Sequence, residues 1–251
     1  MKKTSLDALH RQHQSDAIAR RLSAQVQPRY IGDAVLGAID GCVTTFAVVA
    51  GAVGAGFPAS VALIMGFANL LADGFSMAVS NYEAVRAVHD FRETARLTEE
   101  DHIERIPEGE REEIRQIFAR KGFAGQTLEA IVETICQDRT LWVETMLNEE
   151  YGLQQAPPAP RVSASITFGA FILAGSLPLL PLFFADLDMQ QQFLISAGLA
   201  ALVFFSIGML KSLVFAKPLL RSGLNTLLTG GAAASLAFLA GYLLQQLFGA
   251  S

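Results

Sequence analysis

Five long apolar stretches constrain this chain of 251 residues to a membrane fold. A helix that crosses a bilayer needs about 20 predominantly apolar residues. The stretches with that length and composition are Ala34–Phe57, Ala59–Asn81, Val162–Ala185, Phe193–Leu210 and Ser222–Phe248. Hydrophobic residues make up 51% of the chain and charged residues 17%, which is too apolar for an ordinary soluble domain. The sequence therefore predicts an all-α integral membrane protein with five transmembrane helices.

The basic residues predict the orientation of these spans. All 19 Lys and Arg residues lie before the first stretch, between the second and third, or between the fourth and fifth. Because cytoplasmic loops carry an excess of Lys and Arg, we expect a cytoplasmic N-terminus, a cytoplasmic insert between the second and third spans, and a C-terminus outside. Residues 1–30 contain no apolar signal-peptide core, so the first span would act as its own insertion signal.

The same patterns divide the chain into four parts. Residues 1–30 are expected to form an amphipathic cytoplasmic helix, in which Leu6 and Leu9 lie among basic and polar residues. Residues 31–82 would hold the first two spans, 83–160 a cytoplasmic helical domain that can continue the second span as a stalk, and 161–251 the last three spans. His10 and His13 lie one turn apart and could bind a metal, although a solvated helix face explains them better.

Asp40 and Asp73 lie within the first two spans, and Asp33 directly precedes the first. A carboxylate near the bilayer centre costs at least about 2–3 kcal/mol, so it usually marks an ion pathway. Asp40 lies between Gly37 and Gly41, a small-residue pair that lets another helix approach closely. These positions therefore indicate a path for a cation.

The second span carries further candidate ligands. Asn69, Asp73 and Met77 recur at i, i+4 and i+8, so they stack along one helix face. An amide oxygen, a carboxylate and a thioether suit a borderline metal ion such as Fe²⁺. Packing is the alternative for Met77, and a structural pair with a polar group on another helix is the alternative for Asp73.

The insert carries acidic residues at helical spacing. Glu99 and His102 lie at i, i+3, and Glu110 and Glu113 repeat that spacing on the next predicted helix. Glu150 ends the last predicted helix of the insert, one turn after Met146. Oxygen and imidazole ligands on facing helices can build an Fe²⁺ or Mn²⁺ site. The alternative is a solvated acidic surface, the usual meaning of such charge.

Three segments together resemble one family. They are IGDAVLGAIDG entering the first span, ANLLADGFSMAVSNY in the second, and an insert with IPEGEREEIRQIF and a tryptophan eight residues before Glu150. Over about residues 30–248 the chain resembles the vacuolar iron transporter family, in a version like those of bacteria. The resemblance implies five spans with a cytoplasmic metal-binding domain between the second and third.

The resemblance also implies a function. It implies a homodimer in the bacterial inner membrane that exports Fe²⁺, and often Mn²⁺, from the cytoplasm in exchange for protons. Such a chain is a secondary transporter rather than an enzyme. It has no permanent cofactor, since Fe²⁺ (or Mn²⁺, Zn²⁺ or Co²⁺) is its substrate and also occupies the cytoplasmic domain.

The resemblance assigns roles to individual residues. Asp40 falls on the first-span carboxylate of the family and Met77 on its second-span methionine. The insert positions that fall on metal-binding glutamates, with a methionine beside them, are Glu99, Glu110, Glu113, Glu150 and Met146. Two positions depart from the family pattern. Asn69 replaces a membrane glutamate of plant members, a charge that Asp73 could supply, and His102 replaces an insert glutamate.

Two other functions are compatible with parts of the sequence. A membrane-anchored, ferritin-like di-iron ferroxidase uses paired Glu-x-x-His motifs, of which Glu99–His102 is one half. A non-transporting metal sensor would account for the insert but not for the membrane carboxylates. The chain has no phosphate-binding loop and no nucleic-acid motif, so a nucleic-acid partner is not expected.

Overall fold

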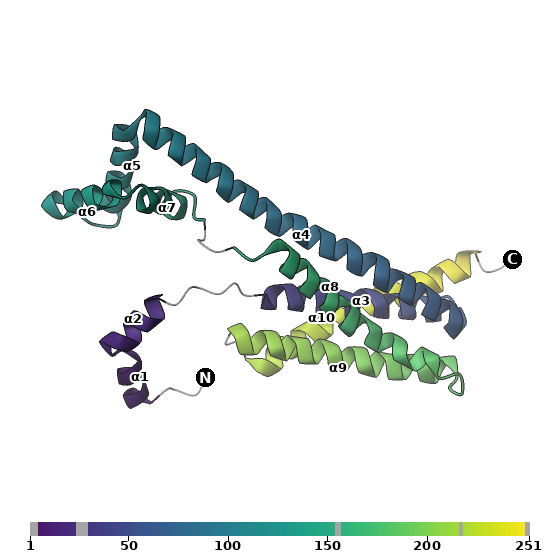
Figure 1. Cartoon of the computed structure of the whole chain (residues 1–251). Coiled ribbons are helices and arrows are strands. Elements are labelled where there is room, and N and C mark those ends of the chain that lie inside the picture. Colours follow the sequence, from purple (N-terminus) through teal and green to yellow (C-terminus); the bar gives the residue numbers. More distant parts are fainter. Residues whose placement is uncertain (1–4, 24–29, 154–156, 216–217, 249–251) are drawn as a thin grey trace. The chain divides into compact units, whose positions relative to one another are not determined.

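The computed structural model describes residues 5–23, 30–153, 157–215 and 218–248 (Figure 1). Within these ranges the chain is helical and forms no strand. The helices are α1 (Leu6–Gln12), α2 (Ser15–Ser23), α3 (Ile31–Gly54), α4 (Ala59–Arg105), α5 (Pro107–Arg120), α6 (Gly125–Gln137), α7 (Arg139–Glu149), α8 (Pro160–Ser176), the 3-10 helix η1 (Leu177–Phe183), α9 (Met189–Phe215) and α10 (Leu219–Phe248).

The chain divides into two compact units. We call Met1–Tyr82 with Pro160–Ser251 the membrane unit, and Glu83–Ala159 the insert unit. Among the described residues, five segments are long and apolar enough to cross a membrane: Ile31–Gly54, Ala59–Arg105, Pro160–Phe183, Met189–Ser212 and Leu219–Phe248. The prediction of an all-α chain with five candidate spans is thus confirmed. The second of these segments, α4, continues without a break into the insert unit, as the stalk interpretation predicted.

The span boundaries differ from the apolar stretches where local chemistry ends a helix. The first helix ends at Gly54 rather than Phe57, because Gly56 has φ +69° and Pro58 follows in the turn to α4. The third span changes from α8 to the 3-10 helix η1 at Leu177. Pro178 and Pro181 supply no backbone N–H there, so regular α-helical bonding cannot continue.

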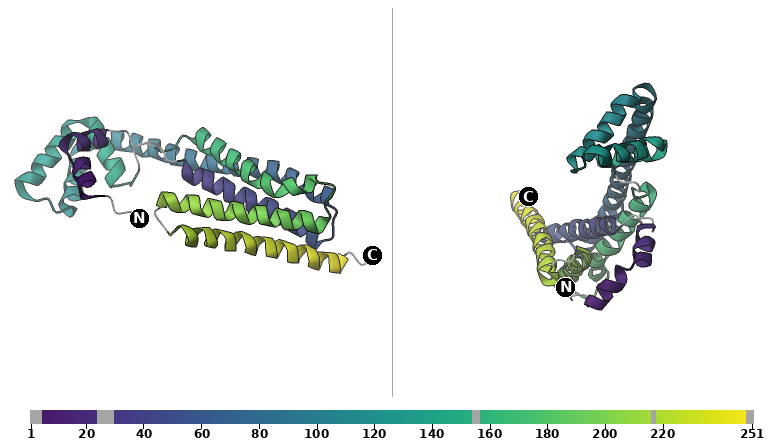
Figure 2. Two further views of the ribbon diagram at one scale, coloured as in Figure 1. Left: turned by 90° about the horizontal axis from the view of Figure 1, so that it is seen from below. Right: turned by 90° about the vertical axis from the view of Figure 1, so that its left-hand side faces the viewer.

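Helix α3 lies at the centre of the membrane unit and packs against α8, α9 and α10 (Figures 1 and 2). A Cβ added at Gly37 would lie 2.2 Å from the carbonyl oxygen of Thr167, and one added at Gly41 would lie 2.3 Å from that of Phe171. The backbones of α3 and α8 therefore touch along the face predicted from the glycine spacing. On α10, a Cβ at Gly241 would lie 2.2 Å from the carbonyl oxygen of Gly51, so α3 meets that helix equally closely.

The insert unit packs α5, α6, α7 and the last part of α4 around a small apolar core. Fully or nearly fully buried side chains in this core include Ile114, Trp142 and Met146. Helix α5 begins at Pro107, because a proline at the start of a helix loses no intrahelical hydrogen bond. After the C-cap Lys121, Gly122 has φ +96°, a conformation that glycine adopts readily and that ends α5.

The N-terminal segment forms two short helices, α1 and α2, rather than one continuous helix. The interruption falls at His13 and Gln14, ahead of Ser15 and Asp16. Ser and Asp favour the first turn of a helix, because a side-chain oxygen can accept hydrogen bonds from the free backbone N–H groups and a negative charge interacts well with the helix dipole. A separate helix, α2, therefore begins at Ser15. The ring of His13 lies with Nδ1 2.8 Å from the carbonyl oxygen of Leu9 in its own helix.

Candidate functional site

The corner between α4 and α5 gathers three possible metal ligands. Glu99 and His102 lie in the last two turns of α4, and Glu110 lies in the first turn of α5. Their ligand atoms all lie within 4.8 Å of one another. His102 Nδ1 is 3.3 Å from an oxygen of Glu110. The chain reversal at Ile106–Pro107 thus brings together carboxylate and imidazole groups that suit Fe²⁺ or Mn²⁺.

The two carboxylates of this corner are buried and only partly bonded. Glu99 and Glu110 are each 1% exposed. One oxygen of Glu99 accepts a hydrogen bond from the Tyr151 hydroxyl at 2.9 Å. Among the described residues, Oε2 of Glu99 and Oε2 of Glu110 are buried and have no hydrogen-bond partner. Because an unpaired buried carboxylate is costly, the arrangement fits a cation that would coordinate the free oxygens.

Burial, together with neighbouring negative charge, raises the pKa of two glutamates at this corner. Burial, followed by the charges of Glu99 and Glu113, raises the pKa of Glu110 to about 8. Burial also raises the pKa of Glu150, with the charges of Glu99 and Glu113 adding to the effect and His102 opposing it. A bound cation would lower these pKa values, because it stabilises the ionised carboxylates. The five groups therefore form one electrostatic cluster.

The remaining predicted ligands of the insert lie around this corner in different settings. Glu113 and Glu150 are exposed, and neither belongs to the group whose ligand atoms lie within 4.8 Å of one another. Met146 is fully buried in the apolar core of the insert unit. The structure thus brings Glu99, His102 and Glu110 together most closely, with the other two glutamates in electrostatic range.

Two supporting interactions involve residues that the sequence analysis did not single out. Tyr151 bonds Glu99, and its ring packs against Phe91 with centroids 6.3 Å apart. Arg92 donates two hydrogen bonds to the carboxylate of Glu144, at 2.7 and 2.8 Å, and so fastens α7 to α4. Both bonds come from the same nitrogen, Nη2, so one donor atom bridges the two carboxylate oxygens. Both contacts join residues 52 positions apart, a separation at which helical periodicity gives no signal.

Asp40 and Asp73 face a shared region of the membrane unit. Asp40 on α3 and Asp73 on α4 are both half-buried, and they lie close enough to interact electrostatically. In the described part of the chain, neither carboxylate takes part in a hydrogen bond or an ion pair. One turn before Asp73, the amide nitrogen of Asn69 is likewise buried without a partner. Met77 is half-buried and packs against the apolar core.

Asp33 has a different environment from the other two membrane carboxylates. Its Oδ1 accepts a hydrogen bond from the side-chain amide of Asn81 at 3.1 Å. The same amide nitrogen donates to the hydroxyl of Thr167 at 2.8 Å. One polar cluster therefore ties α3, α4 and α8 together at this level, and Asp33 is a bonded residue rather than a free one.

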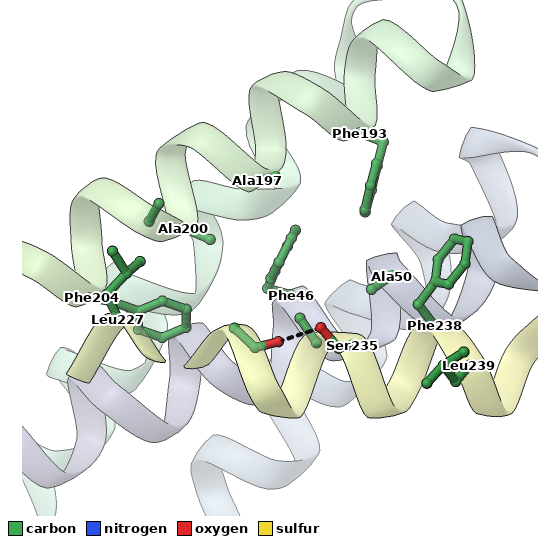
Figure 3. A pocket seen from close by; sticks show the side chains of 13 residues that line it. Phe46, Ala50, Phe193, Ala197, Ala200, Phe204, Leu227, Ser235, Phe238 and Leu239 are labelled. Carbon is green, nitrogen blue, oxygen red and sulfur yellow. Dashed lines mark hydrogen bonds between the residues drawn. The ribbon is translucent and has the colours of Figure 1, made fainter. Parts of the chain in front are cut away.

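An apolar groove of about 600 Å³ between α9 and α10 offers no such ligands (Figure 3). Phe46 of α3, Phe193 of α9 and Phe238 of α10 line it, and the rings of Phe46 and Phe193 stack with centroids 5.9 Å apart. The hydroxyl of Ser235 is bonded to the carbonyl oxygen of Gly231 at 2.8 Å, as the dashed line shows. A metal ion would find no carboxylate, thioether or imidazole among the residues that line this groove.

The raised pKa of Glu110 predicts how the stability of the metal-free insert unit depends on pH. Between its ordinary value of 4.5 and about 8, the folded state binds more protons at this residue than the unfolded state does. The free energy of unfolding therefore falls as pH rises through this window. Trp142, the single tryptophan of the chain, is buried in this unit and reports its melting selectively.

We expect the melting temperature read from Trp142, with a chelator present, to be higher near pH 5 than near pH 8. The Glu110→Gln variant should lose most of this slope. Glu133→Gln, which alters an exposed glutamate on α6, should retain it. A wild-type melting temperature that rises over the same range would contradict the buried, charge-crowded state of Glu110.

Comparison with known proteins gives a consistent match. The family model described as VIT family matches residues 31–242. A protein named vacuolar iron transporter, from Toxoplasma gondii, is 32% identical over 231 residues, which covers 88% of this chain and 76% of the relative. A vacuolar iron transporter from Plasmodium berghei is 30% identical, and the match covers 84% of this chain and 81% of the relative. Vacuolar iron transporter 1 from Oryza sativa subsp. japonica is 28% identical, and the match covers 83% of this chain and 82% of the relative.

Proposed function

This chain belongs to the VIT family, and we propose that it exports Fe²⁺ from the cytoplasm in exchange for protons. The observation that carries the proposal is the cluster of Glu99, His102 and Glu110, in which two buried carboxylate oxygens have no hydrogen-bond partner among the described residues. The names of its relatives support iron as the substrate. Mn²⁺, which prefers similar ligands, would be a second substrate.

The insert unit would capture the metal. Glu99, His102 and Glu110 supply three ligands, and Glu113 and Glu150 add negative charge that raises the local concentration of cations. The family resemblance implies the sulfur of Met146 as a further ligand, from its place in the apolar core of the insert unit. Since Tyr151 holds one oxygen of Glu99, the second oxygen stays available for the ion.

The membrane unit would carry the ion across. Asp40 and Asp73 contribute carboxylates from two helices, and Met77 and Asn69 lie one turn to either side of Asp73. Asp33, held by Asn81, would guide the ion at one end of the path. A carboxylate binds either a metal ion or protons, so binding of one releases the other and produces exchange. Protonation on the outer side would release the metal, and deprotonation on the inner side would prepare the site again.

The assembly and orientation complete the proposal. We infer a homodimer in a bacterial inner membrane, with the N-terminus and the metal-binding insert in the cytoplasm and the C-terminus outside. The one-sided distribution of Lys and Arg supports this orientation. The ferroxidase alternative is less well supported, because the described residues gather a single Glu-x-x-His motif at the candidate metal centre.

Flux into liposomes tests the function and its direction together. Full-length protein reconstituted into liposomes should move Fe²⁺ under anaerobic conditions. A lower pH on the side opposite the insert should accelerate this movement, because protons enter from that side in exchange for iron. A membrane-impermeant maleimide that labels Arg120→Cys in a Cys136→Ser background would report which face carries the insert. An Fe²⁺ flux that does not change with the pH gradient would refute the exchange mechanism. Iron transport only from the face opposite the insert would refute export from the cytoplasm.

A further inference from the structure

A second pocket lies where α9 ends and α10 begins. It has a volume of about 350 Å³, and its lining residues are Lys211, Pro218, Arg221, Ser222, Asn225 and Thr226. The lining is more polar than that of the apolar groove in Figure 3, although the same two helices form both. The pocket therefore presents hydrogen-bonding groups at the end of two candidate spans, and none of the residues assigned to metal transport lines it.

Two cationic side chains, Lys211 and Arg221, line this pocket. Within the described residues, neither Lys211 nor Arg221 forms an ion pair. The sequence supplies no carboxylate nearby along the chain, because no Asp or Glu follows Asp188. Two unpaired cations that line one polar pocket indicate an anionic ligand.

The backbone around the pocket reinforces this preference and fixes its shape. The N-terminus of α10, a helix of 30 residues, lies at Leu219 and contributes a partial positive charge. Beside the pocket, α9 and α10 touch, since a Cβ added at Gly208 would lie 2.7 Å from the Cα of Gly223. This contact holds Lys211, one turn after Gly208, and Arg221 on adjoining helix ends before any ligand arrives.

We propose that this pocket binds the phosphate of an anionic phospholipid headgroup. Arg221 would pair with two phosphate oxygens through its planar guanidinium group, Lys211 would add a second charge, and Asn225 and Ser222 would bond the remaining headgroup oxygens. The source of the phosphate is a lipid rather than the solution, because the pocket lies at the ends of two membrane-spanning segments. Basic pockets between helix ends at the cytoplasmic surface are suited to anionic headgroups.

Native mass spectrometry of the full-length protein in detergent tests the proposal. The probes are phosphatidylglycerol, phosphatidylcholine and inorganic phosphate, each added to the same preparation. Wild-type chain should retain phosphatidylglycerol in preference to phosphatidylcholine, and an excess of inorganic phosphate should not displace the lipid. The double variant Lys211→Gln, Arg221→Gln should bind phosphatidylglycerol about tenfold more weakly or worse, because two charged hydrogen-bonding groups are lost.

Matched variants separate a specific pocket from general attraction to charge. Arg161→Gln removes one cation at the start of another span, α8, and should leave lipid retention unchanged. Arg221→Lys retains the charge but loses the planar fork, so it should weaken retention only partly and serves as the test if the double variant does not fold. Equal retention by wild type and the double variant would overturn the proposal. Equal retention of phosphatidylcholine, or displacement by inorganic phosphate, would overturn the choice of an anionic lipid.

Discussion

Replacing Glu110 by Gln should weaken the binding of Fe²⁺ or Mn²⁺ to the full-length protein by about 100-fold or more. The change removes a ligand charge that is 1% exposed and lies beside Glu99 and His102. Even residues that only support a metal ligand contribute about 10- to 100-fold in affinity, so loss of the ligand itself should have at least that effect. Anaerobic titration calorimetry measures the affinity and the number of ions bound per chain.

A structural role for Glu110 predicts a different result. If this carboxylate mainly held the α4–α5 corner together, Glu110→Gln would lower the melting temperature reported by Trp142. If it is kept for metal, the metal-free variant should be at least as stable as wild type near pH 8, because an unpaired buried charge has been removed. Glu133→Gln, on the exposed side of α6, provides the matched control and should bind metal normally. Undiminished affinity in Glu110→Gln would refute the assignment.

The membrane architecture could be predicted because it depends on run length and on small-residue spacing. Apolar stretches of about 20 residues gave the five candidate spans, and Gly37 with Gly41 indicated a close helix contact that α8 provides. The change of helix type within the third span was not predicted, although the sequence carries its signal. That change depends on Pro178 and Pro181 acting together within an otherwise uninterrupted apolar stretch.

The candidate metal centre was only partly predictable, because spacing along a helix does not show which side chains are buried by other helices. Spacing placed Glu99 with His102 on one face of α4, and Glu110 with Glu113 on one face of α5. It could not show that Glu110 is buried while Glu113 is exposed, because the packing of neighbouring helices decides that difference. The hydrogen bond from Tyr151 to Glu99 was equally inaccessible, since only the folded insert unit brings α7 back to α4.

Asp40→Asn should reduce proton-coupled Fe²⁺ flux in liposomes to the level of vesicles without protein. Asp40 is a half-buried carboxylate on the helix at the centre of the membrane unit, near Asp73, and has no hydrogen-bond or ion-pair partner in the described part of the chain. A charge held this way within a span is costly unless it binds a cation or a proton. Asparagine preserves the size and the hydrogen-bonding capacity of the side chain but can no longer exchange a proton.

The variant separates transport from packing. If Asp40 mainly held helices together, Asp40→Asn would retain most of the flux, because an amide satisfies the same polar contacts. If it carries metal and protons, flux should vanish while the size-exclusion profile matches wild type, and Asp40→Glu should recover part of the flux.

Asp73→Asn should also impair flux, since Asp73 supplies the second carboxylate of the pair. Asp186→Asn, which alters an exposed carboxylate between η1 and α9, is the control for loss of one charge. Near-normal flux in correctly assembled Asp40→Asn protein would place the ion pathway elsewhere in the membrane unit.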